Sequence, residues 1–296
     1  MEPPLGGRLK MVSATAPADG ETPALDALYL APVASAGLRW DPARGAAVTL
    51  NVLGGFRAPN LDDYQALGSG ARSFDTPNGD LGPERSYTVE LGLRWARGPL
   101  TASVWAHGSR LDGLVARVPS TYMGMSVFDG RRVYTRENAS EAWMAGAEAE
   151  VSLRSRWGLY ASVGASYTWA EAAVPDDDGA PVVEPMAKVP PAFGRVAVGV
   201  RRPWWWVDAI LTGALPQDRL ARSDRDDVRL CPDGPDACAS VPGWASVALR
   251  LGARANDHVT VALAVENVFG ASYTPYGAGF AAPGVNVISQ VRVRTR

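Results

Sequence analysis

Hydrophobic and polar residues alternate with a period of two along most of this chain, which predicts β-strands. In residues 86–95, one face carries Tyr87, Val89, Leu91, Leu93 and Trp95, and the other carries Ser86, Thr88, Glu90, Gly92 and Arg94. Such a strand has one apolar and one polar face because successive side chains point in opposite directions. The pattern recurs from about residue 32 to residue 294 and predicts about eleven strands. Residues 1–30 lack this periodicity and are expected to be irregular.

The predicted strands are long, and short connections alternate with long ones. Many approach ten residues or more, whereas strands in globular proteins average about five or six and a tilted membrane-spanning strand needs about 9–11. Short turns are expected near 41–45, 97–99, 155–158, 202–203 and 255–258, and long loops near 58–83, 119–131, 171–190, 216–242 and 270–285. This asymmetry is typical of an antiparallel transmembrane β-barrel with short periplasmic turns and long extracellular loops.

A spanning sheet must close on itself because lipid leaves no water to pair with backbone N–H and C=O groups. Its outer face is then apolar and contacts outer-membrane lipid, whereas its lumen can be polar. Charges of both signs recur on the polar face, among them Glu90, Glu148, Glu150, Arg195 and Arg250, and they predict a lattice of opposite charges in the lumen. A large soluble β-sandwich or propeller is the alternative, which the absence of a repeat of about 40–50 residues disfavours.

Composition argues against several other classes of protein. The net charge of −2 gives no general attraction to nucleic acid. No apolar run reaches the roughly 18 residues of a membrane-spanning helix. Cys231 and Cys238 lie close together in one polar loop and, in an exported protein, predict a local disulfide; two free thiols are the alternative. With no second cysteine pair and no nearby histidine, no metal site and no cofactor are predicted.

Acidic residues gather in two predicted external loops. They are Asp176, Asp177 and Asp178 in one loop and Asp224, Asp226, Asp227, Asp233 and Asp236 in the other. Solvated loop charge is the favoured interpretation, and weak calcium binding through clustered oxygens is the alternative. His107 and Ser109 share the polar face near Asp112, but no nucleophile-elbow pattern accompanies them, so no catalytic residues are predicted and the chain is not expected to be an enzyme.

Five segments, in order, resemble the barrel of the TonB-dependent outer-membrane receptors. They are GFRAPNLDDY (55–64), PNGDLGPERSYTVELGLR (77–94), NASEAWMAGAEAEVSLR (138–154), VENVFGASY (265–273) and APGVNVISQVRVR (282–294). The motif residues, to which we assign structural roles, are Phe56, Arg57, Ala58, Pro59, Asn60, Pro83, Glu84, Glu266, Asn267, Phe269 and Tyr273. The resemblance implies that residues 31–296 form the C-terminal half of such a barrel in the bacterial outer membrane.

The sequence departs from this family in several ways. The N-terminal plug domain and its energy-coupling box are not found, Val285 stands where arginine is usual, and no aromatic residue ends the chain. The N-terminus also lacks the apolar core of a signal peptide. The family barrel has about 22 strands, and an odd count near eleven would put the N-terminus on the wrong side of the membrane. These features predict a C-terminal portion from a split gene, a late start or a truncation.

The resemblance implies an uptake receptor for a scarce nutrient, such as a ferric siderophore or cobalamin. Its partners would be the missing plug and barrel half and, through the plug, the inner-membrane TonB complex. Loop aromatics that could touch a small-molecule ligand are Tyr64, Phe74, Tyr122, Tyr276 and Phe280, although such residues more often pack loops together. The alternatives are a passive pore or adhesin built on a smaller barrel, or a non-functional remnant.

Overall fold

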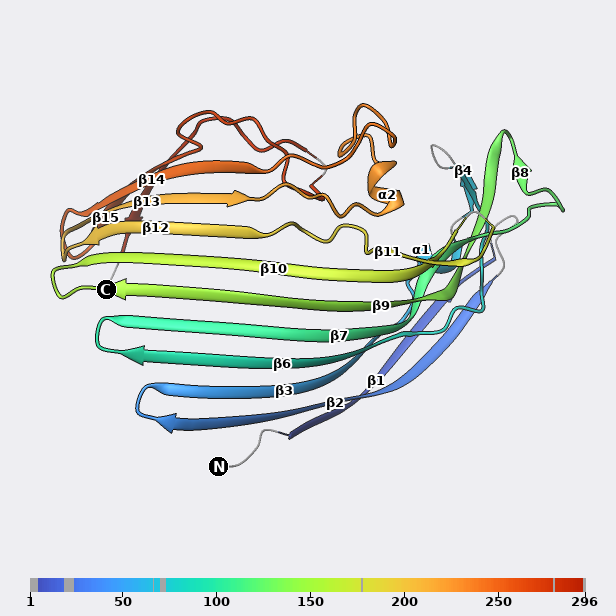
Figure 1. The fold of residues 1–296 in the computed structure, drawn as a ribbon, viewed down its shortest axis with the longest axis horizontal. Helices are drawn as coiled ribbons and strands as arrows, with labels where there is room; N and C mark the ends of the chain where they lie inside the picture. Colours follow the sequence, from blue (N-terminus) through green and yellow to red (C-terminus); the bar gives the residue numbers. More distant parts are fainter. Residues whose placement is uncertain are drawn as a thin grey trace.

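A computed structural model, which describes residues 5–18, 24–65, 67–69, 73–176, 178–278 and 280–294, contains one 16-stranded sheet. Twelve strands follow one another across it (Figure 1). They are β1 (Leu5–Ala16), β2 (Leu25–Ala43), β3 (Ala46–Arg57), β6 (Glu84–Arg97), β7 (Leu100–Pro119), β9 (Arg131–Arg154), β10 (Leu159–Pro175), β12 (Phe193–Arg201), β13 (Trp205–Ala214), β14 (Trp244–Arg254), β15 (Val259–Glu266) and β16 (Asn286–Val293). Each pairs antiparallel with its neighbours in this order.

The remaining elements belong to the long connections. They are α1 (Leu61–Gln65), β4 (Gly68–Ser69), β5 (Ser73–Asp75), β8 (Val127–Phe128), β11 (Pro181–Pro185) and α2 (Arg222–Arg225). All lie at one end of the sheet, the loop end, and the tight turns lie at the other, the turn end (Figure 1). Neither α1 nor α2 is long and apolar enough to cross a membrane. The predicted all-β architecture with loops at one end and turns at the other is confirmed.

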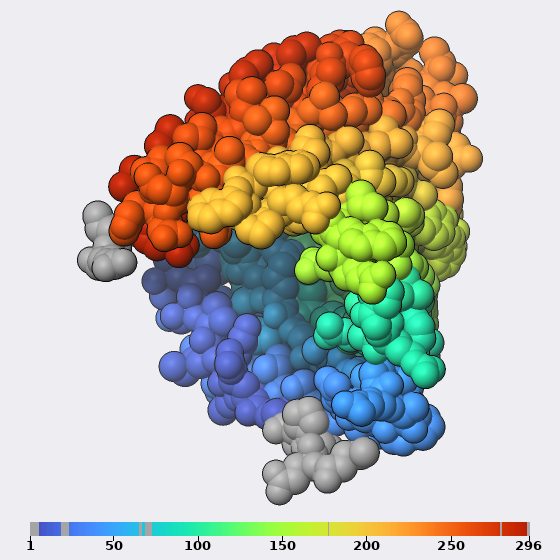
Figure 2. All heavy atoms as spheres, turned by 90° about the vertical axis from the view of Figure 1, so that its left-hand side faces the viewer, coloured from blue at the N-terminus to red at the C-terminus, as the bar shows by residue number. Residues whose placement is uncertain are grey.

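The sheet is strongly curved and surrounds a hollow, here called the lumen (Figure 2). In the part of the chain that the structure describes, β1 pairs only with β2 and β16 only with β15, so the sheet is not closed. Two strand edges therefore keep unpaired backbone groups, which hydrocarbon does not tolerate.

The expectation that residues 1–30 are irregular is wrong. β1 occupies residues 5–16, and β2 begins at Leu25 rather than near residue 32. Leu9 and Met11 alternate with Arg8 and Lys10, and pairing sets Met11 opposite Leu30. The two glycines before this stretch and the mixed residues after it obscure the period in the sequence. β1 raises the count to twelve, so the parity argument from an odd count is also wrong; β1 runs away from the turn end and β16 runs toward it (Figure 1).

One face of the sheet carries a continuous band of exposed apolar side chains. Pairing sets Leu50 opposite Leu91, and further along the sheet it sets Leu211 opposite Val247. Their exposure is large for apolar residues, with Leu91 at 45% and Leu211 at 45%. Exposed apolar patches much beyond a few hundred Å² are rare on soluble monomers. A lipid-facing barrel wall requires such a band.

The opposite face lines the lumen, and large rings there lie over glycines of the neighbouring strand. The indole of Trp105 on β7 occupies the space that a Cβ atom at Gly92 on β6 would need. Trp206 on β13 does the same above Gly252 on β14. These glycines let bulky side chains lie flat against the wall, which keeps the lumen open.

The long connections differ from the predicted plain loops. The predicted loop at 171–190 contains the end of β10, which reaches Pro175 and pairs with β11 in a hairpin. In the loop that follows β3, β5 pairs in parallel with β9 and is therefore fixed to the sheet. Added strand pairing thus holds both segments against the barrel wall.

Candidate functional site in the lumen and at the loop end

The first motif forms a charged junction at the base of the loop after β3. The Arg57 guanidinium donates to both oxygens of Glu84 at 2.6 and 2.7 Å and to Asp63 at 2.7 Å. Asn60 caps α1 reciprocally: its Oδ1 accepts from the Asp63 N–H at 2.9 Å, and its own N–H donates to Asp63 Oδ2 at 3.0 Å. Burial opposes ionisation of Asp63, but the bonds from Asn60 and Arg57 outweigh it, so the pKa of Asp63 is lowered.

Other motif residues near this junction are buried or half-buried. Pro59 is buried, and Phe56 and Ala58 are half-buried beside it. Glu84, which follows the half-buried Pro83, also accepts the backbone N–H of Val115 at 3.0 Å. The junction therefore fixes the first long loop to β6 and β7 without offering a free charge to a ligand.

The motif after β15 folds into a tight corner. Asn267 is 5% exposed and has a φ of 50°. Its side chain bonds Ala271 N at 2.9 Å, Ala271 O at 2.8 Å and Pro283 O at 3.0 Å. Tyr273 stacks on Trp244 with ring centroids 4.2 Å apart. This corner holds both ends of the last long loop together.

Two other residues of this motif behave differently. Glu266 faces Arg250, with 3.4 Å between Oε1 and Nη2. Phe269 is 80% exposed, so it contributes little packing within the chain. A large exposed ring next to the strand ends suits a membrane interface better than water.

The predicted ligand-contact aromatics divide into packed and exposed residues. Tyr64 is 1% exposed, and its hydroxyl bonds that of Tyr29. Phe74 is also buried, with its ring centroid 4.8 Å from that of Tyr122 and 4.9 Å from that of Phe128. Tyr64 and Phe74 thus offer no surface to a ligand, and Tyr122 is half-buried against Phe74.

The other two candidates lie on the last long loop. Phe280 is 79% exposed and keeps its ring available for contact. Tyr276 instead donates its hydroxyl to Oδ2 of the buried Asp224 at 2.6 Å. Burial, followed by this bond to a carboxylate, raises the pKa of Tyr276. Tyr276 therefore joins two loops rather than presenting its hydroxyl at the surface.

Asp224 is the centre of a junction between three loops, here called the Asp224 junction. It is 0% exposed, accepts the Lys188 backbone N–H at 3.1 Å and lies 3.2 Å from Lys188 Nζ. Lys188 also pairs with Asp227 at 2.9 Å, and Asp227 pairs with Arg229 at 2.7 Å. Nothing in the local sequence of Lys188 indicates this role, because its acidic partners are more than 30 residues away.

A disulfide joins Cys231 and Cys238 in the same loop, with 5.5 Å between the Cα atoms. Cys231 packs with Leu220, Leu230 and Val241 in a small apolar cluster. Asp224 and Asp227 of the acidic group are already engaged by other side chains. Over the described ranges, no group of three or more side chains could hold a metal ion, while Asp177 lies outside those ranges.

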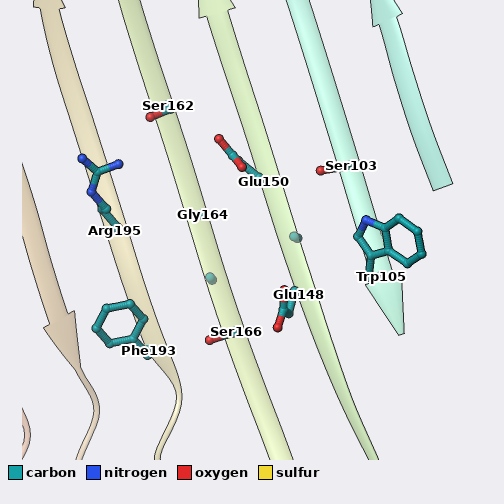
Figure 3. Close-up of a pocket in the computed structure, with 11 residues that line it drawn as sticks. Ser103, Trp105, Glu148, Glu150, Ser162, Gly164, Ser166, Phe193 and Arg195 are labelled. Carbon is teal, nitrogen blue, oxygen red and sulfur yellow. The ribbon is translucent and has the colours of Figure 1, made fainter. Parts of the chain in front are cut away.

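The lumen wall contains a hollow of about 440 Å³ lined mainly by small, polar and charged residues. Figure 3 shows Glu148 and Glu150 on β9 and Arg195 on β12 on either side of β10, whose Ser162 and Ser166 also line the hollow. Within the described part of the chain, neither glutamate forms an ion pair with Arg195. The predicted lattice of opposite charges is therefore incomplete: Arg201 pairs with Asp208, but this central patch is unpaired.

Comparison with known proteins identifies this architecture. Residues 6–268 match the family model described as TonB dependent receptor-like, beta-barrel. No curated protein matches the chain at a significant level.

Solved structures share the fold at low sequence identity. The copper transporter OprC has 17% identity and a TM-score of 0.76, and the match covers 98% of this chain and 44% of the transporter. The FrpB iron transporter from Neisseria meningitidis (F3-3 variant) has 19% identity and a TM-score of 0.69, covering 91% and 40%. The siderophore receptor PirA from Acinetobacter baumannii has 16% identity and a TM-score of 0.65, covering 89% and 41%. The chain therefore spans less than half the length of these proteins.

Proposed function

Because this chain belongs to the TonB-dependent receptors and forms part of their β-barrel, we propose that it serves in the uptake of a scarce nutrient across the bacterial outer membrane. The nutrient would be of the ferric-siderophore or cobalamin type. The observation that carries the proposal is the division of the sheet into an apolar outer face and a charged lumen, whose central glutamates form no ion pair among the described residues.

The unpaired lumen wall supports a role in a larger assembly. Carboxylates such as Glu148 and Glu150 face a hollow, and a cationic segment seated in the lumen would pair with them. The family resemblance supplies such a segment in the plug domain, which would also couple the barrel to the TonB complex. The solved relatives, a copper transporter, an iron transporter and a siderophore receptor, favour a metal-bearing nutrient.

The test is nutrient accumulation in the bacterium that encodes the chain. Deletion of its coding sequence should reduce uptake of one radiolabelled nutrient among ferric siderophores, cobalamin and copper, measured under limitation for that nutrient. Re-expression should restore uptake, and a protonophore should abolish the restored fraction. Uptake that persists with the protonophore would favour a passive pore, and unchanged accumulation of all three would overturn the proposal.

The loop end supplies a matched pair of variants for the same assay. Phe280 is exposed in the last loop, whereas Phe74 is buried in the first. Phe280→Ala should raise the half-saturating nutrient concentration without lowering the amount of receptor in the membrane. Phe74→Ala should lower the amount of receptor instead, because it removes a packed ring.

A further inference from the structure

A second hollow lies at the turn end of the lumen, on the side that faces the viewer in Figure 2, and five arginines line it. Its volume is about 520 Å³. The arginines are Arg201, Arg202, Arg254, Arg292 and Arg294, and the acidic residue in the lining is Asp257. We call this site the arginine hollow.

The sheet register brings these arginines together. Arg254 on β14 pairs with Thr260 on β15, which pairs with Arg292 on β16, so the two arginines share the lumen face two strands apart. Neighbouring strands are about 4.8 Å apart, which separates the two Cα atoms by about 10 Å. The Trp206 ring, lying flat over Gly252, adds an apolar side to the hollow between Arg201 and Arg254.

Backbone contacts hold the last arginine in place. The Arg294 N–H donates to His258 O at 2.8 Å, and the His258 ring nitrogen Nδ1 lies 3.1 Å from Arg294 O. The end of β16 is thereby tied to the turn between β14 and β15. Positions on five strands and in two turns thus converge on one hollow through regular pairing.

The positive charge of the hollow exceeds the negative charge that the chain places against it. Arg201 pairs with Asp208 at 3.2 Å. Over the described ranges, no ion pair is found for Arg202, Arg254, Arg292 or Arg294. Asp257 balances one of these four charges at most. Exposed arginines are often simply solvated, but several like charges around one concavity repel each other and attract a multiply charged anion.

We propose that the arginine hollow binds a phosphate-bearing anion with two or more negative charges. Guanidinium groups present planar pairs of N–H donors that match phosphate oxygens in a bidentate manner. All the basic side chains of the described lining except His258 are arginines, and the volume accommodates a diphosphate-sized group with an organic part against Trp206. The phosphate could belong to a soluble compound in the lumen or to a phospholipid headgroup at the rim.

Pyrophosphate titration of the refolded chain, residues 1–296, in an uncharged detergent tests the site. We expect pyrophosphate binding that calorimetry can measure. The double variant Arg254→Gln/Arg292→Gln should weaken this binding about tenfold or more, since each substitution removes charge-assisted hydrogen bonds. Arg97→Gln is the control for the loss of one positive charge at the turn end, because Arg97 lies outside the hollow, whereas Arg254→Gln and Arg292→Gln each remove one charge inside it. Arg97→Gln should leave the affinity unchanged.

Further variants distinguish a specific phosphate-binding site from non-specific electrostatic attraction of anions. Arg254→Lys/Arg292→Lys keeps the charge and should still weaken binding severalfold, because lysine lacks the planar fork. Arg294→Gln provides a second single-charge test, and far-UV circular dichroism verifies that every variant has the same strand content. Equal weakening by Arg97→Gln and by the double variant, or no binding of pyrophosphate, would overturn the proposal.

Two further binding experiments identify the source of the phosphate and test a rival ligand. Vesicles of phosphatidylglycerol that compete with pyrophosphate better than phosphatidylcholine vesicles would assign a lipid headgroup, and failure of both to compete would assign a soluble phosphate. A hexaglutamate peptide that binds more tightly than pyrophosphate would overturn the phosphate assignment in favour of an acidic polypeptide. None of these outcomes depends on which nutrient the receptor carries.

Discussion

The two ends of the barrel wall differ in how their charges are satisfied. At the loop end, Arg57 and Lys188 each pair with two carboxylates. At the turn end, the described residues show no ion pair for Arg254 or Arg292, although both border one hollow. Regions whose charges are paired within the chain hold the structure together, whereas regions with unpaired charge facing a hollow mark where another molecule belongs.

The Asp224 junction offers the strongest way to disrupt the loop end. Asp224→Ala removes a fully buried carboxylate and leaves the Tyr276 hydroxyl and the Lys188 ammonium without that partner. Hydrogen bonds to a charged acceptor contribute about 1.5–3 kcal/mol each, so losing the bonds to this buried carboxylate should cost about 3 kcal/mol. We expect much faster amide hydrogen exchange in residues 216–242. Asp236→Ala, an exposed carboxylate in the same loop, is the control; equal exchange in the two variants would contradict the assignment.

The disulfide should have the next largest effect on this loop. A covalent link between residues separated by 7 positions lowers the conformational entropy of the unfolded loop. In the chain-entropy description this stabilises the folded loop by about 2–3 kcal/mol. Cys231→Ser/Cys238→Ser should therefore be cleaved faster by proteases within residues 216–242. Reductant should accelerate cleavage of the unmodified protein to the same rate and leave the double variant unaffected. Acceleration of both proteins by reductant would point to another cause.

Sequence reasoning can predict the parts of this fold that repeat a local rule. The alternation around Leu91 recurs in eleven strands and is sufficient to locate them. It fails in β1, where Gly6 and Gly7 break the period and strand formation depends on pairing with β2. Periodicity describes which face a residue occupies, but only pairing determines whether a weakly patterned segment becomes a strand.

The candidate sites are less predictable because they depend on contacts between distant segments. The Arg57 motif can be located, but its pairing with Glu84 is a contact across 27 positions. The arginine hollow escapes sequence reasoning because Arg201 and Arg292 belong to separate strands that look ordinary in the sequence. Alternation places Arg254 and Arg292 on the polar face, but only the register through β15 sets them at the same height on the wall.

Low pH should destabilise the loop end by protonating Asp227. Bonds from Arg229, and then Lys188, outweigh burial and hold the pKa of Asp227 below its ordinary value near 4. A depressed pKa contributes stability above the ordinary pKa that is lost progressively as the pH falls toward the folded-state value. Protease resistance of residues 216–242 should therefore decrease below about pH 4. In Asp227→Asn the resistance should already be lower at pH 7 and should change less with acid; an unchanged acid response would exclude Asp227 as the cause.

The smallest expected effect concerns the lumen glutamates, and it tests the comparison most directly. Glu148 and Glu150 are exposed on neighbouring positions of one wall and lack ion pairs within the described residues. Glu148→Gln/Glu150→Gln should change the free energy of unfolding of the isolated chain by less than about 0.5 kcal/mol. Glu84→Gln, which weakens two bonds to Arg57, should cost about 1 kcal/mol in the same denaturant titration. If Glu148→Gln/Glu150→Gln instead lowers the free energy of unfolding as much as Glu84→Gln does, the lumen glutamates already have partners within the chain. Unpaired charge would then no longer indicate where a second component binds.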